Sequence, residues 1–408
     1  MRLLQSTLPA LATAVIGVVS AAAPVNAQLS QPQRVVRHSP DGDRWRFAPE
    51  FRLAETFDDN PFLLSDSRKS GLQAPSSSSV TNGRYDAMTS SSDYITSLRG
   101  GFGAQGPLLG GHKASLSGHA RYEYYQSNVK RRNMVYDLRG LQSLGHGSEL
   151  GARAEIQPKY FFRNFLSDAI DLNGDRVIDQ SERIYAAGTF SDQEFAGEFS
   201  QRVLKPGNGG SGATLTIEAG RKVRNYQQPF QTRSYRGPFV GGGAELDLGS
   251  GLGIDADYHR YSLRSTPGPT VLLLNEPDFN QDFNGNGTTT DLRVRSVQTV
   301  DFSRLEQEFS GRFRVRPAGS VETSIGYVLR LRNYESTQRY DVYNNTRRDR
   351  RNGLTLDVGY RLAPGTAVHI GGRGEIQKLT NTLRVTAPVE DVTDYSRKSF
   401  YLSWSQKL

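Results

Sequence analysis

The spacing of the connections constrains this chain more than any other feature of its sequence. After residue 43, segments of alternating apolar and polar residues are joined in turn by a short Gly- and Pro-rich connection and by a longer polar one. The short connections fall at residues 105–111, 145–148, 205–210, 249–251, 317–320 and 363–366. Tight turns at one end and long loops at the other are typical of a transmembrane β-barrel of the outer membrane.

Within each segment, apolar residues recur at every second position, which is the period of a strand with one apolar face. In the segment 309–315, Phe309, Phe313 and Val315 alternate with Arg312 and Arg314. We therefore predict an all-β fold, an antiparallel up-and-down barrel of about fourteen strands, with short periplasmic turns and long extracellular loops. The expected strands lie around residues 45–57, 96–102, 116–124, 134–138, 150–162, 195–203, 215–219, 240–248, 252–258, 309–315, 321–331, 354–362, 368–376 and 400–404.

Composition excludes a helical membrane protein and a disordered chain. Mean hydropathy is −0.56, and beyond the N-terminal region no apolar run is long enough for a membrane-spanning helix. Disordered chains are poor in aromatic residues, whereas this chain has 19 Tyr and 19 Phe among 408 residues. It has no Cys, so an exported fold must be closed without disulfides, as the ladders of a barrel allow.

The chain divides into three parts. Residues 1–27 are expected to be a secretory signal peptide, because Arg2 precedes an apolar stretch that ends in a small-residue cleavage site at Ala27. Residues 28–43 are polar and predict a flexible periplasmic segment, and residues 44–408 form the barrel. The last strand, residues 399–408, resembles the C-terminal signal that the barrel assembly machinery reads, although it ends in Leu408 and not in Phe. The expected location is the outer membrane of a Gram-negative bacterium.

The polar face of each strand is expected to line the lumen. An arginine that faced lipid near the bilayer midplane would cost about 2–4 kcal/mol. Acids dominate residues 240–260 and arginines dominate residues 310–375, which predicts oppositely charged walls across a wet pore. The candidate lumen and solute residues are Arg312, Arg314, Arg330, Arg332, Arg361, Arg373, Asp255 and Asp257.

Two loops have the spacing of calcium ligands. Residues 171–182 match a twelve-residue EF-hand loop, except that Arg176 occupies the usual position of the turn glycine. A second, weaker match has Gly287 at the turn position but Arg293 at position twelve. Ca²⁺ is therefore the expected structural cofactor, and a solvated acidic loop or an Asn/Gly turn is the alternative. The candidate ligands are Asp171, Asn173, Asp175, the Val177 carbonyl, Asp179 and Glu182, and in the second loop Asp282, Asn284 and Asn286.

Residues 55–62 follow the first strand and include Asp58, Asp59 and Asn60. This segment resembles a motif of the outer-membrane β-barrel porins that are associated with exopolysaccharide export, with Phe57 in place of the commoner Tyr. The resemblance covers eight residues and the overall strand layout. It implies a barrel conduit and suggests polysaccharide as cargo. The acidic residues either bind substrate or Ca²⁺ or cap the turn that leaves the strand, and capping is the favoured interpretation.

The net charge of +8 suggests anionic partners. The basic segments 130–132 and 347–351 are predicted to contact lipopolysaccharide phosphates in preference to a transported glycan, and nucleic acid is not an expected partner. The predicted function is a porin-like conduit for a hydrophilic solute, anionic or glycan in nature. The alternatives are a non-conducting adhesin or structural barrel and an outer-membrane hydrolase. Three histidines face inward, His119, His259 and His369, with His259 near Asp257 and His369 near Glu375 in the sequence. Enzymatic activity is not expected, because no set of serine, histidine and acid converges by spacing alone.

Overall fold

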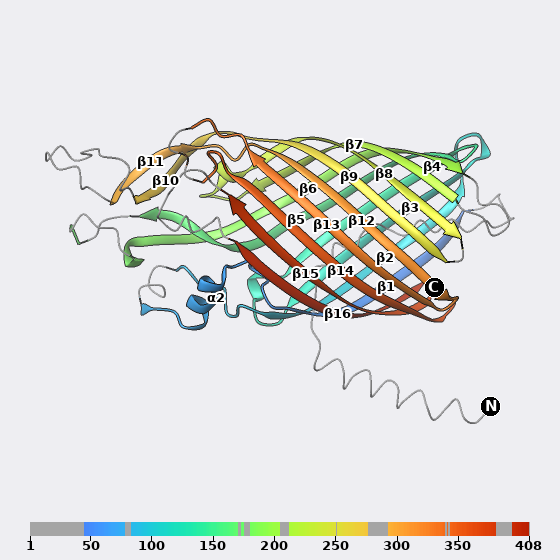
Figure 1. Cartoon of the computed structure of the whole chain (residues 1–408), viewed down its shortest axis with the longest axis horizontal. Helices are drawn as coiled ribbons and strands as arrows, with labels where there is room; N and C mark the ends of the chain where they lie inside the picture. The colour runs from blue at the N-terminus through green and yellow to red at the C-terminus, as the bar shows by residue number, and fades with distance from the viewer. Residues whose placement is uncertain are drawn as a thin grey trace, which may run out of the picture.

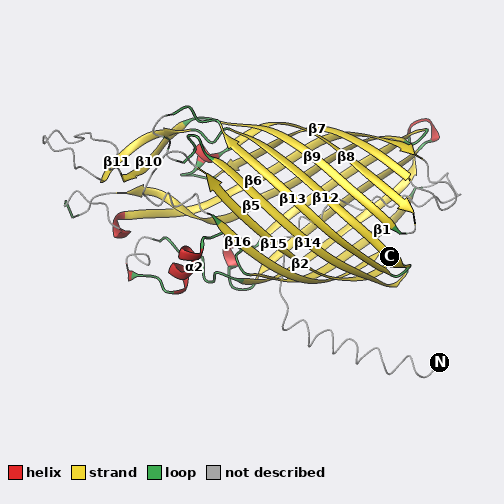
Figure 2. Ribbon diagram, in the orientation of Figure 1, coloured by secondary structure: helices red, strands yellow, loops and turns green. Residues whose placement is uncertain are grey.

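The computed structural model describes residues 45–77, 83–169, 173–174, 180–204, 212–249, 251–275, 293–338, 341, 343–380 and 394–407. The expected signal peptide and the periplasmic segment lie outside these residues, so both stay predictions. Within the described residues, fourteen strands close into one antiparallel barrel (Figure 2). They are β1 (Arg46–Asp58), β2 (Asp93–Pro107), β3 (Lys113–Tyr125), β4 (Asn133–Gly145), β5 (Ser148–Ala169), β6 (Arg183–Leu204), β7 (Gly212–Tyr226), β8 (Tyr235–Gly249), β9 (Leu252–Ser265), β12 (Arg304–Ala318), β13 (Val321–Tyr334), β14 (Arg348–Ala363), β15 (Thr366–Thr380) and β16 (Tyr395–Lys407).

The barrel closes because its first strand pairs with its last. β1 is antiparallel to β2 on one side and to β16 on the other. The predicted fourteen-strand up-and-down barrel is thereby confirmed. Between β9 and β12, β10 (Gly268–Asn275) and β11 (Arg293–Val300) form a separate two-stranded sheet that projects from one end (Figure 1). The strand pattern did not predict this hairpin, because it lies in a segment interpreted as a long loop.

The short connections lie together at one end of the barrel, which we call the turn side, and the long connections define the loop side. Glycine is needed in the turns because the backbone there adopts a positive φ. In the turn from β14 to β15, Gly365 has a φ of 83°, and a Cβ at this position would lie 2.5 Å from the carbonyl oxygen of Lys407. The Gly-rich spacing in the sequence therefore reflects tight turns against neighbouring strands.

The outer face of the barrel is apolar. In β14, Leu354, Leu356 and Leu362 are each at least 50% exposed and alternate with polar residues on the other face. Exposed Phe, Leu, Ile and Val side chains occupy the same parity in the other barrel strands. This arrangement is the lipid-facing surface of a transmembrane β-barrel. In the described part of the chain, no helix is long and apolar enough to cross a membrane.

The opposite face is concave and charged. Ion pairs on this face reach across an intervening strand, from Glu50 of β1 to His119 of β3 (3.3 Å) and from Arg139 of β4 to Glu198 of β6 (2.6 Å). Side chains on second-neighbour strands approach each other on the inner face of a curved sheet and diverge on its outer face. The polar parity therefore faces the lumen.

A small apolar core lies on the loop side, under the connection between β1 and β2. This connection contains the helix α2 (Asp66–Gln73). Phe62, Leu64, Leu72 and Met88 of the connection pack against Phe161 of β5. β5 and β6 are each 22 residues long, and their loop-side ends support an ordered cap of apolar side chains.

Candidate functional site

The structure places the eight predicted lumen residues on the inner face and pairs four of the six arginines among them with acids. Arg314 illustrates this, because its Nη2 lies 2.8 Å from Oδ1 of Asp255. Arg312 and Arg361 form no ion pair with the described residues. The other ion pairs of this set join Arg314 to Glu245, Arg330 to Glu306 and Glu308, Arg332 to Glu306, and Arg373 to Glu375.

The expectation that acid-rich and arginine-rich strands form opposite walls is wrong. The acid-rich β9 is hydrogen-bonded directly to the arginine-rich β12, with Asp255 in register with Arg312 and Asp257 with Ser310. Opposite charges on neighbouring strands attract, so these side chains form pairs along one wall. Sequence order suggested a separation that the closed sheet does not have.

The basic wall lies elsewhere, on three strands that follow one another. Arg52 of β1 is in register with Arg99 of β2, and Arg99 is in register with Arg121 of β3. We call these three residues the arginine rung. Side chains at directly opposed positions have Cβ atoms about 4.5–5.5 Å apart, and like charges there destabilise the sheet unless something offsets them.

Protein carboxylates offset the arginine rung only in part. Arg52 donates a hydrogen bond to the hydroxyl of Ser403 at 2.9 Å. Arg99 lies 3.7 Å from Asp137, and Arg121 lies 3.3 Å from Glu123. The Nε atom of Arg99 is buried without a hydrogen-bond partner, whereas the Nε atom of Arg121 makes the contact with Glu123. Guanidinium groups in this state are suited to a carboxylate or phosphate oxygen from a solute.

Strand order places the arginine rung across the lumen from acidic residues. β9 is the seventh strand from β2 in both directions around the barrel. It contributes Asp255 and Asp257 to the inner face, and its neighbour β8 contributes Glu245 and Asp247. Glu245 and Asp255 both pair with Arg314 of β12, so this wall is partly neutralised, and the arginine rung faces it from the other side of the lumen.

The inner face is more solvated on the turn side than on the loop side. Toward the turn side, the side chains of Glu245 and Glu50 are 44% and 28% exposed. Toward the loop side, the carboxylates of Asp58 and Glu375 are fully buried in ion pairs. Water therefore has most access to the lumen from the turn side, while packed ion pairs occupy the loop-side end.

The three inward histidines each face a carboxylate, but not those that sequence proximity suggested. His259 pairs with Glu218 of β7 and not with Asp257. His369 lies 3.1 Å from Asp357 of β14, and the expected neighbour Glu375 instead binds arginines. Among the described residues, no serine hydroxyl is hydrogen-bonded to these imidazoles.

Two of the histidine–carboxylate pairs span an intervening strand. A glycine on that strand, between the two side chains, allows each pair to form. Glu50, Gly101 and His119 are in register across β1, β2 and β3, and a Cβ on Gly101 would lie 2.4 Å from the His119 ring. Glu218 and His259 are arranged in the same way around Gly241 of β8. The imidazole therefore lies over the glycine and reaches the acid beyond it.

Several arginines of the predicted basic loops are structural. Arg131 is 2% exposed and donates to the carbonyl of Phe162 at 2.7 Å. Arg347 is buried in a bidentate pair with Asp349, both contacts being 2.8 Å. For these residues the expectation of an exposed phosphate contact is wrong, because their neighbours in space, not in sequence, decide their burial.

Asp58, Asp59 and Asn60 cap the end of β1, which confirms the favoured interpretation. The Asn60 amide group donates to the carbonyls of Leu64 and Ser396 at 2.7 and 2.8 Å. Asp58 accepts two hydrogen bonds from Arg397 of β16, at 3.0 and 2.5 Å. The motif therefore fastens the first strand to the last at the loop-side end.

Seven of the nine expected calcium ligands lie outside the described residues, namely Asp171, Asp175, Val177, Asp179, Asp282, Asn284 and Asn286. Two ligands of the first loop are described, and they lie close together. The carboxylate of Glu182 is 2% exposed and accepts a hydrogen bond from the backbone N–H of Asn173 at 3.3 Å. Among the described residues, no three His, Asp or Glu side chains converge as metal ligands.

No known family model and no curated protein matches the chain. Several solved barrels resemble it at low identity. The outer membrane channel DcaP of Acinetobacter baumannii has 10% identity and a TM-score of 0.40, covering 91% of this chain and 99% of that one. A Pseudomonas aeruginosa FadL homologue has 10% identity and a TM-score of 0.43, covering 88% and 90%. Salmonella typhi OmpF has 9% identity and a TM-score of 0.39, covering 90% and 98%. Likeness at this level does not identify a solute.

Proposed function

We propose that the protein is an outer-membrane conduit for small hydrophilic anions. The arginine rung carries this proposal, because three guanidinium groups on adjacent strands face the lumen and protein carboxylates offset their charge only in part. A solute carboxylate or phosphate binds the solvent-accessible side of these guanidinium groups and offsets the repulsion between the arginines. Uronate-containing glycan fragments belong to this solute class, in keeping with the resemblance of residues 55–62.

Permeation by three sugars of similar size but different charge tests the solute class. Liposomes that contain the purified protein are placed in glucuronate, glucose or glucosamine, and the swelling rates are compared. We expect glucuronate to enter fastest and glucosamine slowest, because the rung attracts the anion and repels the cation. Equal rates for the three sugars would contradict an anion preference while leaving a conduit in place.

A non-conducting structural barrel is the second candidate, and the buried ion pairs on the loop side favour it. Fully buried carboxylates such as Asp58 and Glu375 leave little room for water at that end of the lumen. Single-protein recordings in planar bilayers separate the two functions. We expect discrete conductance steps from a conduit, whereas a correctly folded barrel that stays silent would support the structural role.

We also propose that the loop 171–182 binds Ca²⁺. The contact between the Asn173 backbone and the Glu182 carboxylate supports this, because it brings positions three and twelve of the loop together. Calorimetric titration of the full-length protein is expected to show Ca²⁺ binding that Asp171→Ala weakens at least tenfold. Binding that is unaffected by Asp171→Ala would rule out this loop as the site.

The proposed orientation has the turn side in the periplasm and the loop side outside the cell. Short periplasmic turns and longer extracellular loops are the rule for bacterial barrels. The barrel assembly machinery is a proposed partner, since β16 is an alternating strand in which Phe400 and Trp404 face outward. Outer-membrane lipid contacts the apolar face.

A further inference from the structure

The lipid-facing surface is charged at one end only. Among the described strands, outward positions near the turn side are uncharged, as at Leu144, Leu248 and Leu362. Near the loop side, exposed basic residues replace the apolar ones at outward positions. These residues are Arg221, Arg236, Arg260, Arg264, Arg348, Arg350, Lys378 and Lys398.

Three of these residues form a cluster without acidic partners. Arg236 lies on β8, between β7 and β9. Arg221 of β7 is in register with Pro238 of β8, two residues from Arg236. Arg260 of β9 is in register with Val240 of β8. We call Arg221, Arg236 and Arg260 the outer basic cluster. All three are exposed, and none forms an ion pair with a described residue, whereas the nearby Arg264 pairs with Glu335.

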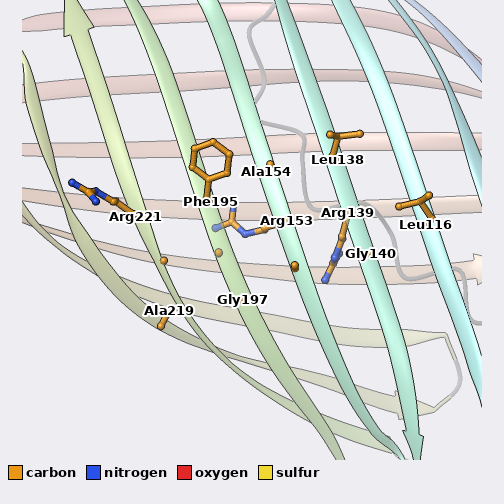
Figure 3. Close-up of a pocket in the computed structure, with 13 residues that line it drawn as sticks. Leu116, Leu138, Arg139, Gly140, Arg153, Ala154, Phe195, Gly197, Ala219 and Arg221 are labelled. Carbon is orange, nitrogen blue, oxygen red and sulfur yellow. The ribbon is translucent and has the colours of Figure 1, made fainter. Parts of the chain in front are cut away.

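A groove in the outer wall reaches Arg221, one residue of this cluster. It has a volume of about 550 Å³ and crosses β3 to β7, with Arg221 in its lining (Figure 3). Its floor consists of Gly140, Ala152, Gly197 and Ala219, which are in register from β4 to β7. Larger apolar side chains, among them Leu116, Leu138 and Phe195, form its walls.

We propose that the groove and the outer basic cluster together bind lipid A, the phosphorylated glycolipid of the outer leaflet. The cluster contacts a phosphate, and the groove holds one acyl chain. Arginine at a lipid surface is favoured beside an anionic headgroup and not beside a neutral one. Because acyl chains are as apolar as the barrel wall, the groove contributes packing and the phosphate contributes the preference for this lipid.

The one-sided distribution of charge supports this choice of lipid. Lipopolysaccharide occupies only the outer leaflet. In the described strands, exposed basic residues at outward positions lie at the loop-side border, which the proposed orientation places in that leaflet. The inference is independent of solute transport. A silent barrel could bind lipid A as well as a conducting one, so the two proposals can fail separately.

Lipid titration with native mass spectrometry tests the site. The purified full-length protein in detergent is titrated with bisphosphorylated lipid A, with its dephosphorylated form and with phosphatidylglycerol. We expect lipid A to bind at least tenfold more tightly than either of the other two. Equal binding of the dephosphorylated form would exclude a phosphate contact. Equal binding of phosphatidylglycerol would show that the site binds anionic lipids in general and has no preference for lipid A.

Matched variants locate the site. The triple variant Arg221→Gln, Arg236→Gln, Arg260→Gln is expected to lose at least tenfold in affinity for lipid A. The control Arg348→Gln, Arg350→Gln, Lys398→Gln removes the same charge from another part of the same border and is expected to change affinity less than twofold. An equal loss in both variants overturns the site in favour of a general effect of charge.

Filling the groove tests the acyl contact separately. Gly140→Val and Gly197→Val suit this purpose, because a Cβ on Gly140 meets only Leu116 at 4.0 Å and one on Gly197 meets only a backbone oxygen at 3.9 Å. The double variant is expected to fold and to bind lipid A several-fold more weakly. Unchanged affinity would show that the acyl chain does not occupy the groove.

Discussion

Reversal of one charge in the arginine rung, by Arg99→Glu, is expected to abolish or invert the preference of the barrel for anions. At a separation of about 6 Å, one charge changes the energy of a passing ion by roughly 0.7 kcal/mol in bulk water and by roughly 3 kcal/mol at an effective dielectric constant of 20. The substitution changes the rung by two charges. We therefore expect the anion-to-cation permeability ratio, measured from the reversal potential in a salt gradient, to fall about tenfold or more.

The control for this experiment is Arg348→Glu. It makes the same change in net charge, but Arg348 is exposed on the outward parity of β14 at the loop-side end. Its reversal potential is expected to stay close to that of the unmodified protein. Equal shifts in the two variants would assign selectivity to net charge, and an unshifted reversal potential in Arg99→Glu would remove the rung from the proposed function.

Asp58→Ala is expected to lower the free energy of unfolding by about 3–5 kcal/mol, because it leaves the buried guanidinium of Arg397 without its partner. The pair joins β1 to β16, the seam at which the barrel closes. Denaturant titration of the protein in lipid vesicles, followed by the shift in gel mobility between folded and unfolded forms, measures this loss. Because the seam is involved, the unfolding rate is expected to rise as well.

The neighbouring Asp59→Ala is the matched control. Asp59 accepts a hydrogen bond from the backbone N–H of Lys398 at 2.7 Å, also across the seam, but this contact is exposed to solvent. Its loss is expected to cost about 1 kcal/mol, the usual range for a single hydrogen bond. A comparable loss in both variants would indicate that burial of the Asp58 pair is not what stabilises the closure.

The fold was predictable because strand period and connection length are local properties. A residue such as Leu356 faces lipid because its neighbours in sequence alternate with it, and the turn at Gly365 is visible as a Gly beside a Pro. These local signals predict three features of the barrel: the even number of strands, the direction of each strand, and whether each residue faces the lumen or the lipid. The α2 segment and the β10–β11 hairpin escaped them, since both lie in long connections without a clear alternation.

The arginine rung was not predictable in the same way. Arg52, Arg99 and Arg121 lie on the polar parity of three separate strands. The only sign of the rung in the sequence is a mid-strand arginine in each of three consecutive strands. Their alignment depends on register, which parity does not specify. The same limit explains the histidines, because His259 reaches Glu218 over Gly241 and is not bonded to the nearer Asp257.

The barrel, its two unlike ends and the side chains that face the lumen can all be inferred from the amino-acid sequence, since each depends on residues within one strand or one turn. Which charges are neutralised depends on the closed barrel. It paired Arg314 with Asp255 and buried Arg131 and Arg347, but it set three other arginines side by side. The physical reason is that Coulomb interactions depend on separation across strands, and closing the sheet sets those separations.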